Sequence, residues 1–349
     1  MTDVKVKIAN LFKIFGPNPN GVMGLVKDGI SKHDLLDQHK HVLGLRDINI
    51  DVPAHRIQVI MGLSGSGKST LIRHINRLIE PTSGEVVIDG EDVLAMSQMR
   101  LREFRRHKIS MVFQNFGLLP HRTVTQNVAY GLTIQGIKGN TAYERSQHWI
   151  ERVGLTGFES HYPAQLSGGM RQRVGLARAM ATDAEILLMD EAFSALDPLI
   201  RTDMQDVLLG LQEELHKTII FITHDLDEAL RIGDQIAILR DGVVIQLGDP
   251  QEIIMNPADD YIADFTKDIN RSRVIEVRSI MENAASASGP KLASSMPIGD
   301  ALQILIGAKE NTGLVVDNND EIVGGVNLER VVSAIARPDK ELKEGSRYK

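Results

Sequence analysis

The sequence contains no cysteine, which excludes both a disulfide framework and a thiolate metal site. It also lacks any run approaching the roughly 20 apolar residues that a membrane-spanning helix needs. The first residues, Met1 to Val6, contain no apolar core of the kind found in signal peptides. We therefore expect a soluble chain whose role at a membrane comes through a partner.

Basic residues do not dominate the charge, since 46 acidic residues face 39 basic ones and leave a formal net charge of -7. Non-specific binding to nucleic acid needs a dominant basic face, so this balance argues against a nucleic-acid partner. One local cluster departs from the average and consists of Arg100, Arg102, Arg105 and Arg106. It is typical of a solvated helix face, and contact with anionic lipid or a membrane partner is the alternative.

The length of 349 residues and the hydrophobic content of 42% suit one large domain with a smaller one attached. Short apolar runs at residues 57–61, 109–113, 186–189 and 218–223 alternate with helical stretches. This alternation predicts an α/β fold with a buried, mostly parallel sheet. Ligands in such folds bind beyond the carboxyl ends of the strands, so the polar residues after these runs should share one edge. An Asp-Gly pair between residues 236–239 and 243–246 predicts a hairpin.

Two regions stand outside this pattern. Residues 17–41 contain a predicted helix in which Ser31 and Asp34 have capping-box spacing, and we interpret them as a surface insertion. The C-terminal region at 271–337 is a small α+β segment, with a loop-like stretch, a helix, a strand, an acidic turn, a strand and a helix. These features are expected at residues 284–295, 298–306, 313–316, 317–320, 321–326 and 328–335. The predicted domains are therefore 1–270 and 271–337, followed by a disordered tail at 338–349.

A glycine-rich loop follows the predicted strand at 57–61 and opens a predicted helix. It matches the G-x-x-x-x-G-K-[ST] pattern of phosphate-binding loops with Gly62, Leu63, Ser64, Gly65, Ser66, Gly67, Lys68, Ser69 and Thr70. Its glycines let backbone N–H groups surround phosphate oxygens, and the helix start adds positive potential. We expect Lys68 to neutralise the terminal phosphates of ATP and the Ser69 hydroxyl to bind Mg²⁺. The loop alone would fit a kinase, a G protein or a motor.

Two adjacent carboxylates follow the predicted strand at 186–189. Asp190 at the edge of the sheet can hold Mg²⁺, directly or through water, and Glu191 beside it can accept a proton from attacking water. Acidic residues at strand ends are also common as caps and ion-pair partners. Asp190 and Glu191 therefore indicate a catalytic site only in combination with other motifs.

The most specific string in the chain is Leu-Ser-Gly-Gly-Met-Arg-Gln-Arg at residues 166–173. Ser167, Gly168 and Gly169 can form an anion-binding nest at a helix start, although a capped helix without a ligand has the same structure. The string resembles the signature motif of ABC transporter ATP-binding subunits. Around it, in the family's order, Gln114 resembles the Q-loop, residues 194–197 the D-loop and His224 the switch histidine.

The resemblance covers about residues 4–265 and implies a P-loop NTPase fold of the ABC type with a helical signature subdomain. It implies that Ser69, Gln114 and Asp190 serve Mg²⁺, that Glu191 is the catalytic base and that His224 senses the γ-phosphate. Through the signature residues 167–169, each subunit touches the ATP bound to the other, so a head-to-tail homodimer is expected. Asp197 becomes an interface residue, and Phe15 is the residue expected to stack on adenine.

A closer resemblance is to the ATP-binding subunits of glycine betaine, proline betaine and choline importers, carried by residues 11–16, 60–67, 76–82 and 189–201. It implies a peripheral subunit on the cytoplasmic face of the cell membrane. Its partners would be a permease, docking near residues 115–119, and indirectly a solute-binding protein. Since an ATPase subunit does not contact the solute, choline or an amino acid stays open. A non-transport ABC ATPase and a P-loop kinase are the competing functions.

Residues 271–337 resemble a single CBS-type repeat, carried by the strand, the Asp317–Asp320 turn, the strand at 323–326 and the closing helix. Such modules usually work in pairs, so a lone repeat would pair across the dimer or be degenerate. Regulation by ionic strength or by a nucleotide is one interpretation. A small dimerisation appendage is the other.

Overall fold

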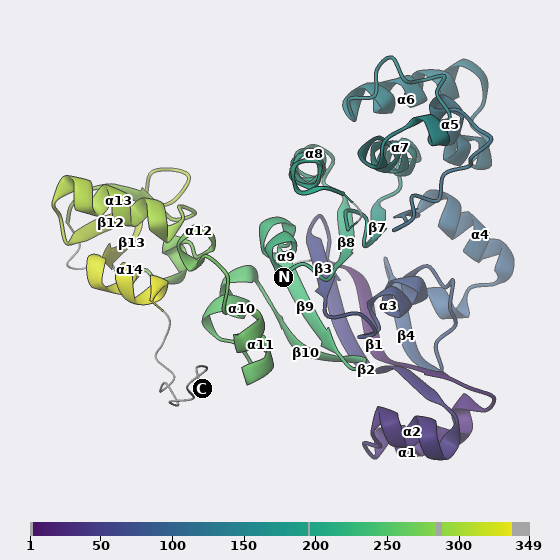
Figure 1. Ribbon diagram of the computed structural model, residues 1–349, viewed down its shortest axis with the longest axis horizontal. Helices are drawn as coiled ribbons and strands as arrows, with labels where there is room; N and C mark the ends of the chain where they lie inside the picture. The colour runs from purple at the N-terminus through teal and green to yellow at the C-terminus, as the bar shows by residue number, and fades with distance from the viewer. Residues whose placement is uncertain (1–2, 195, 284–287, 337–349) are drawn as a thin grey trace, which may run out of the picture. The chain divides into compact units, whose positions relative to one another are not determined.

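The computed structural model describes residues 3–194, 196–283 and 288–336, so the tail predicted at 338–349 lies outside it. The chain divides into two compact units, Met1–Asp249 and Pro250–Lys349 (Figure 1). This division falls before the predicted boundary at residue 270, because α10 (Pro250–Met255) is bonded to the segment that follows. Gln251 donates a hydrogen bond to the carbonyl oxygen of Val274 over 2.8 Å and accepts one from Glu276 N at 2.9 Å.

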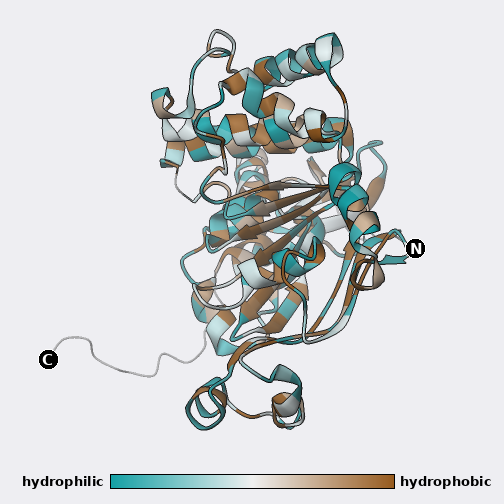
Figure 2. Ribbon diagram, turned by 90° about the vertical axis from the view of Figure 1, so that its right-hand side faces the viewer, coloured by the Kyte–Doolittle hydropathy of each residue, from teal (hydrophilic) through white to brown (hydrophobic). Residues whose placement is uncertain are grey.

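The centre of the first unit is a six-stranded sheet with the order β10-β9-β3-β8-β7-β6. Its strands are β3 (Ile57–Met61), β6 (Ile109–Val112), β7 (Ile186–Asp190), β8 (Thr218–Thr223), β9 (Gln235–Arg240) and β10 (Val243–Gly248). Neighbouring strands are parallel except for the β9–β10 hairpin. Every residue of β3, β7 and β8 is buried, as in strands covered on both faces, and Figure 2 shows the sheet as a hydrophobic centre. The predicted strands and hairpin are confirmed.

An antiparallel sheet that the sequence analysis did not predict covers part of the same core. It has the order β2-β1-β4-β5, with β1 (Val4–Phe15), β2 (Val42–Pro53), β4 (Ser83–Ile88) and β5 (Glu91–Asp92). Buried side chains from both sheets share one cluster, which includes Val6, Ile48, Ile60 and Leu188. The helices α3 (Lys68–Ile75), α4 (Gln98–His107), α8 (Pro198–Leu215) and α9 (Leu226–Ile232) complete this part of the unit, with the short helix Val93–Ala95.

The insertion between β1 and β2 is helical, as expected. It contains a short helix at Pro19–Val22, α1 (Met23–Lys27) and α2 (Lys32–His39). The Ser31 hydroxyl accepts a hydrogen bond from Asp34 N at 3.0 Å and caps α2. The apolar side chains of the insertion, including Val26 and Leu35, pack against residues of β1 and β2 in a small separate cluster.

A separate helical lobe carries the 166–173 segment (Figure 1). It consists of α5 (Val124–Ile134), α6 (Gly139–Arg152), a short helix at Pro163–Gln165 and α7 (Gly168–Ala181). The lobe has its own buried cluster, with Val128, Ile150 and Val174 among its members. This lobe corresponds to the helical subdomain that the family resemblance implies.

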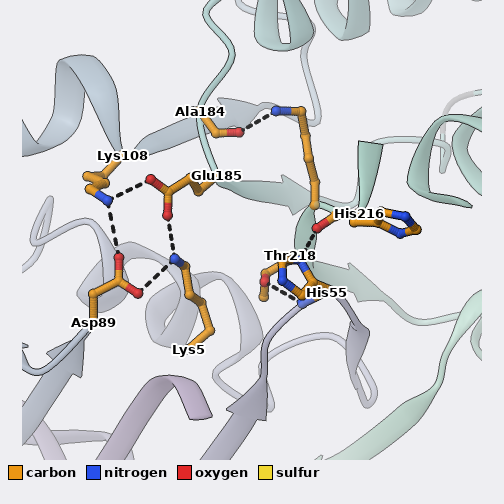
Figure 3. A network of polar contacts seen from close by, with 9 residues as sticks. Lys5, His55, Asp89, Lys108, Ala184, Glu185, His216 and Thr218 are labelled. Atoms are coloured by element: carbon orange, nitrogen blue, oxygen red, sulfur yellow. Dashed lines mark hydrogen bonds and ion pairs between the residues drawn. The ribbon is translucent and has the colours of Figure 1, made fainter. Parts of the chain in front are cut away.

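Four charged side chains connect the two sheets of the first unit (Figure 3). Lys5 contacts both Asp89, at 2.7 Å, and Glu185, while Lys108 lies 2.6 Å from Glu185 and 3.4 Å from Asp89. Lys108 precedes β6 and Glu185 precedes β7. The cluster therefore lies at the edge of the parallel sheet opposite to the carboxyl ends of the strands.

The second unit is a small α+β structure. It comprises α10, α11 (Asp260–Phe265), α12 (Arg271–Val274), a short helix at Val277–Ser279, β11 (Lys291–Ala293), α13 (Ile298–Ala308), β12 (Thr312–Val316), β13 (Ile322–Asn327) and α14 (Leu328–Ile335). The predicted helices and the two longer strands are confirmed. Of the loop predicted at 284–295, residues 284–287 lie outside the described residues, and the rest is wrong in part, since β11 pairs in parallel with β12 and buries Leu292. Three residues are too short a run for periodicity to reveal.

Candidate functional site

The phosphate-binding loop lies between β3 and α3, as the sequence predicts. Gly62 has a φ of +152°, and a Cβ there would lie 2.1 Å from the Leu239 carbonyl oxygen. Gly67 has a φ of +106°, and a Cβ there would lie 2.8 Å from the Gly44 carbonyl oxygen. Both positions therefore require glycine for the loop to pass so close to neighbouring backbone.

The loop suits an anion. Helix α3 begins at Lys68 after Gly67, without any side-chain cap, so its first N–H groups are available to an external acceptor. Ser66 is 5% exposed, and its hydroxyl has no hydrogen-bond partner among the described residues. Ser64 and Gly65 are exposed, and so is Leu63, which lies on the outer side of the loop. Phosphate oxygens would satisfy the donors that this arrangement leaves free.

Lys68 is buried at the base of the loop. Its ammonium group donates to the carbonyl oxygens of Gly62 at 2.7 Å and Leu63 at 3.1 Å, and it lies 3.7 Å from Glu191 Oε1. Burial lowers the pKa of Lys68, and the nearby carboxylates of Glu191 and Asp190 oppose that shift. The site therefore combines a positive loop with two negative side chains.

Asp190 ends β7 and faces the start of α3. Its Oδ1 accepts a hydrogen bond from the Ser69 hydroxyl at 2.8 Å, and its Oδ2 lies 3.4 Å from the Arg73 guanidinium. Thr70, next to Ser69, accepts a bond from His74 through its carbonyl oxygen. No group of three or more His, Asp or Glu side chains close enough to hold a metal ion occurs within the described ranges. The Ser69–Asp190 pair would therefore need phosphate oxygens and water to complete a Mg²⁺ shell.

The carboxylate of Glu191 lies close to three other predicted residues, Lys68, Gln114 and His224. Gln114 Nε2 donates to Glu191 Oε2 over 3.1 Å, and His224 Nδ1 lies 3.4 Å from the same oxygen. Glu191 has a φ of +46°, which is unusual for a residue with a side chain and is typical of functional sites. Its backbone is held by bonds to Ile222 O and from the Ser194 hydroxyl. Five residues predicted from four separate motifs thus lie at one edge of the sheet: Lys68, Gln114, Asp190, Glu191 and His224.

Phe15 ends β1 beside the phosphate loop and is 39% exposed. A Cβ on Gly44 would lie 2.8 Å from the Phe15 ring, and the Gly44 carbonyl lies against Gly67. The backbone of Gly44 therefore lies between the Phe15 ring and Gly67 of the phosphate-binding loop. The Lys13 ammonium lies 4.8 Å from the centre of the Phe15 ring.

The signature residues and Asp197 are not brought to this cluster within one chain. Ser167 caps α7 by accepting a bond from Met170 N at 3.3 Å, and a Cβ on Gly169 would lie 2.6 Å from Ile200. Gly168 is the first residue of α7, and Figure 1 shows α7 in the helical lobe, away from α3. Asp197 caps α8 by accepting from Ile200 N at 3.1 Å. Ser167 and Asp197 therefore act as helix caps within the subunit, and Gly168 and Gly169 form the first turn of α7.

Two arginines that support the site were not predicted from the sequence. Arg73 lies four residues after Ser69, so helical spacing alone could have placed it near Asp190. Arg178 on α7 donates to the carbonyl oxygens of Gly117 at 2.6 Å and Phe116 at 2.9 Å, just after Gln114. Burial lowers the pKa of Arg178. Only the fold reveals this contact.

The basic cluster on α4 is largely engaged within the chain. Arg100 pairs with Glu91 and Arg106 with Glu103, while Arg105 donates to the carbonyl oxygens of Asn76 and Arg77. These contacts favour the solvated helix face over a lipid-binding patch. Across the described parts of the chain, no helix is long and apolar enough to cross a membrane.

Comparison with known proteins gives consistent matches. The family described as "ABC transporter" matches residues 45–194. The glycine betaine/proline betaine transport system ATP-binding protein ProV of Escherichia coli is 46% identical, over 96% of this chain and 83% of that protein. The glycine betaine transport ATP-binding protein OpuAA of Bacillus subtilis is 50% identical, over 84% and 71% respectively. The trimethylamine N-oxide transport system ATP-binding protein TmoW of Pelagibacter ubique is 41% identical, over 98% and 100%.

Solved structures agree with these sequence matches. The dimeric structure of a post-hydrolysis state of the ATP-binding cassette MJ0796, bound to ADP and Pi, has a TM-score of 0.60 to this chain. It is 32% identical, and the match covers 70% of this chain and 98% of that one. Together with the phosphate loop and the residues gathered around Glu191, these matches show that the chain belongs to the family of ABC transporter ATP-binding proteins.

Proposed function

We propose that this chain hydrolyses ATP to energise the import of glycine betaine, proline betaine or a related quaternary amine. The observation that carries the proposal is the convergence of Lys68, Asp190, Glu191, Gln114 and His224 at one edge of the sheet. The solute class rests on relatives named for glycine betaine transport that match 84–96% of the chain. Trimethylamine N-oxide is a second candidate solute, because TmoW matches over the whole of its length.

In the proposed reaction, the 62–70 loop binds the phosphates of ATP, and Lys68 turns its ammonium group toward the β- and γ-phosphates. Mg²⁺ bound by Ser69, Asp190 and Gln114 would neutralise charge that develops on the phosphates. Glu191 accepts a proton from the attacking water, for which its position beside Gln114 and His224 is suitable. His224 contacts the γ-phosphate, and Phe15 stacks on adenine beside the loop.

We propose that two chains form a head-to-tail homodimer that closes on two ATP molecules. Residues 167–169 of each chain would then reach the γ-phosphate in the other, which explains why they lie away from Lys68 within one subunit. Asp197 would lie in that interface. The dimeric cassette among the similar structures supports this arrangement. Closure excludes water from the site and thereby couples hydrolysis to movement.

The homodimer is proposed to lie on the cytoplasmic face of the membrane, bound to permease subunits that receive solute from a binding protein. Residues 115–119 are the proposed docking segment, and Arg178 holds this segment at Phe116 and Gly117.

The competing functions are ATP hydrolysis outside transport and transfer of phosphate to an acceptor, as in a kinase. Co-purification with a membrane permease distinguishes them from an importer.

Residues 271–337 of the second unit are proposed to form a single CBS-like repeat, and a regulatory role and a dimerisation role are the two interpretations. Its strands and helices follow the order that the resemblance implies, with the additional strand β11. Removal of residues 250–349, the whole compact unit, should abolish a response of transport to ionic strength while leaving basal ATP hydrolysis intact. An unchanged salt response would make the unit a dimerisation appendage.

The decisive experiment is reconstitution of the chain with its permease and binding protein in lipid vesicles. We expect glycine betaine or a related amine to stimulate ATP hydrolysis. With the binding protein outside and with ATP enclosed in the lumen, on the side of the ATP-binding subunits, the solute should accumulate in the lumen. Parallel assays with choline, trimethylamine N-oxide and an amino acid identify the solute. Stimulation by the amino acid alone would overturn the proposed solute class. An absence of ATP hydrolysis under all conditions would overturn the proposed activity.

A further inference from the structure

Arg201 lies on the first turn of α8 and contacts two loops at once. One guanidinium nitrogen, Nη1, donates to Asp225 Oδ2 over 2.8 Å, and the other, Nη2, donates to the Leu196 carbonyl oxygen over 3.2 Å. Leu196 belongs to the segment at 194–197, which precedes α8. Asp225 directly follows His224. A single side chain therefore links the 194–197 segment to the loop that carries the histidine.

Asp225 is held at both carboxylate oxygens. While Oδ2 accepts from Arg201, Oδ1 accepts from Glu228 N at 3.2 Å and caps α9. The Asp225 backbone N–H donates to the Thr223 hydroxyl at 3.0 Å. His224, between these two anchored residues, has a side chain that is 53% exposed and lies 3.4 Å from Glu191. Because the ring itself is weakly packed, the anchored backbone sets its position.

A second contact runs beside the first. Gln205, one turn after Arg201 on α8, donates to Glu228 Oε1 over 3.1 Å, and both side chains are buried. The Arg201 Nε group is also buried, and it has no acceptor among the described residues. Buried N–H groups normally have a partner, so Arg201 has hydrogen-bonding capacity that the described contacts do not use.

We propose that Arg201 is a positioning residue that transmits the position of the 194–197 segment to His224. This inference rests on the proposed function, in which Asp197 of that segment lies in the dimer interface. Closure of the dimer moves the segment, and Arg201 transfers the movement through Asp225 to the histidine beside Glu191. A bidentate guanidinium suits this role, because it holds both loops in a fixed relative geometry.

The test compares Arg201→Gln with Arg231→Gln. The two arginines make similar ion pairs between the same helices, since Arg231 on α9 lies 2.7 Å from Asp206 on α8. Loss of a positioned group typically costs about 10- to 100-fold in rate, so Arg201→Gln should lower kcat by that amount and leave the KM for ATP unchanged. Arg231→Gln should keep the kcat of the wild type. Arg201→Lys keeps the charge but cannot hold both loops, so its kcat should stay low.

Asp225→Asn, which preserves the shape of the side chain, provides the second arm. If the two residues act through one contact, the double variant Arg201→Gln/Asp225→Asn should be no slower than the slower single variant. A kcat of Arg201→Gln equal to that of the wild type would overturn the inference, as would an equal loss in Arg231→Gln or multiplicative effects in the double variant. A wild-type chain without ATPase activity would instead refute the proposed function.

Discussion

The side-chain amide of Gln114 donates a hydrogen bond to the carboxylate of Glu191 over 3.1 Å, although 77 positions separate the two residues in the sequence. The contact connects the end of β6 to the end of β7. It fixes Glu191 Oε2, the oxygen that also faces His224. The base proposed for water activation is therefore oriented from two sides.

Replacement of that carboxylate should separate binding from hydrolysis. Glu191→Gln keeps the size of the side chain but removes the proton acceptor, so the rate of phosphate release should fall by about 10²–10⁴. ATP binding should persist, and size-exclusion chromatography with ATP should show a trapped dimer. Glu213→Gln, an exposed position on α8, is the control. A wild-type rate in Glu191→Gln would contradict the assignment of the base.

The glycines of the phosphate loop should differ in their tolerance of a side chain. In Gly62→Ala, the added Cβ would lie 2.1 Å from a backbone carbonyl at a φ of +152°, so the strain should cost at least about 1–3 kcal/mol and abolish ATP binding. Gly65→Ala adds its Cβ to open space and should cost only the conformational penalty, about 1–2 kcal/mol. Thermal unfolding and binding of a fluorescent ATP analogue measure both. Equal effects of the two changes would refute the steric argument.

Loss of the Phe15 ring should weaken nucleotide binding. Stacking of a base on an aromatic ring is worth about 1–3 kcal/mol, so Phe15→Ala should raise the Kd for ATP by about 5- to 150-fold, whereas Phe15→Trp should retain affinity. Phe158, which is about equally exposed at 37%, is the matched control. Titration by calorimetry gives the comparison, and an unchanged Kd in Phe15→Ala would place adenine elsewhere.

The ion cluster in Figure 3 should stabilise the fold only above acidic pH. Hydrogen bonds from Lys108 and Lys5 lower the pKa of Glu185 to about 2, from an ordinary value of 4.5. Its contribution is therefore fully present above pH 4.5 and is lost as the pH falls toward 2. Since the Glu185 side chain is half exposed, Glu185→Gln should reduce the free energy of unfolding by only about 0.2–1 kcal/mol at pH 7.

Urea unfolding at a series of pH values checks this expectation. The difference between the wild type and Glu185→Gln should shrink between pH 4.5 and pH 2. A pH-independent difference would mean that Glu185 contributes through packing rather than through its charge.

Much of the site was predictable because each motif is local in sequence and ends a buried strand. Lys68, Asp190 and His224 follow runs that are mostly apolar and wholly buried, and parallel strands bring such ends together. Arg73 could have been placed only through its four-residue spacing from Ser69 on one helix. Arg201 was not predictable, because it contacts Asp225 through the packing of α8 against the β8–α9 loop. A single sequence does not state which helix covers which strand end.

Some strands of the fold were predictable from the sequence and others were not. The runs that form β3, β7 and β8 were recognisable because both faces of each strand are buried, whereas the antiparallel sheet of β1 and β2 was not identified. The register of β1 shifts several times against β2, which interrupts the alternation that reveals a half-buried strand. The boundary at Asp249 depends on Gln251, whose side chain bonds to residues more than 20 positions away.

Strand β7 separates the ion cluster from the site along a single segment, with Glu185 before its first residue and Glu191 after its last. Six residue steps in an extended strand span about 20 Å, at which two unit charges interact by less than about 1 kcal/mol at an effective protein dielectric constant of about 20. A charge altered at Glu185 is therefore weakly felt at Glu191. Substitutions at Glu185 can therefore change how the stability of the fold responds to acid while leaving the charge environment of Glu191, the proposed base, nearly unchanged.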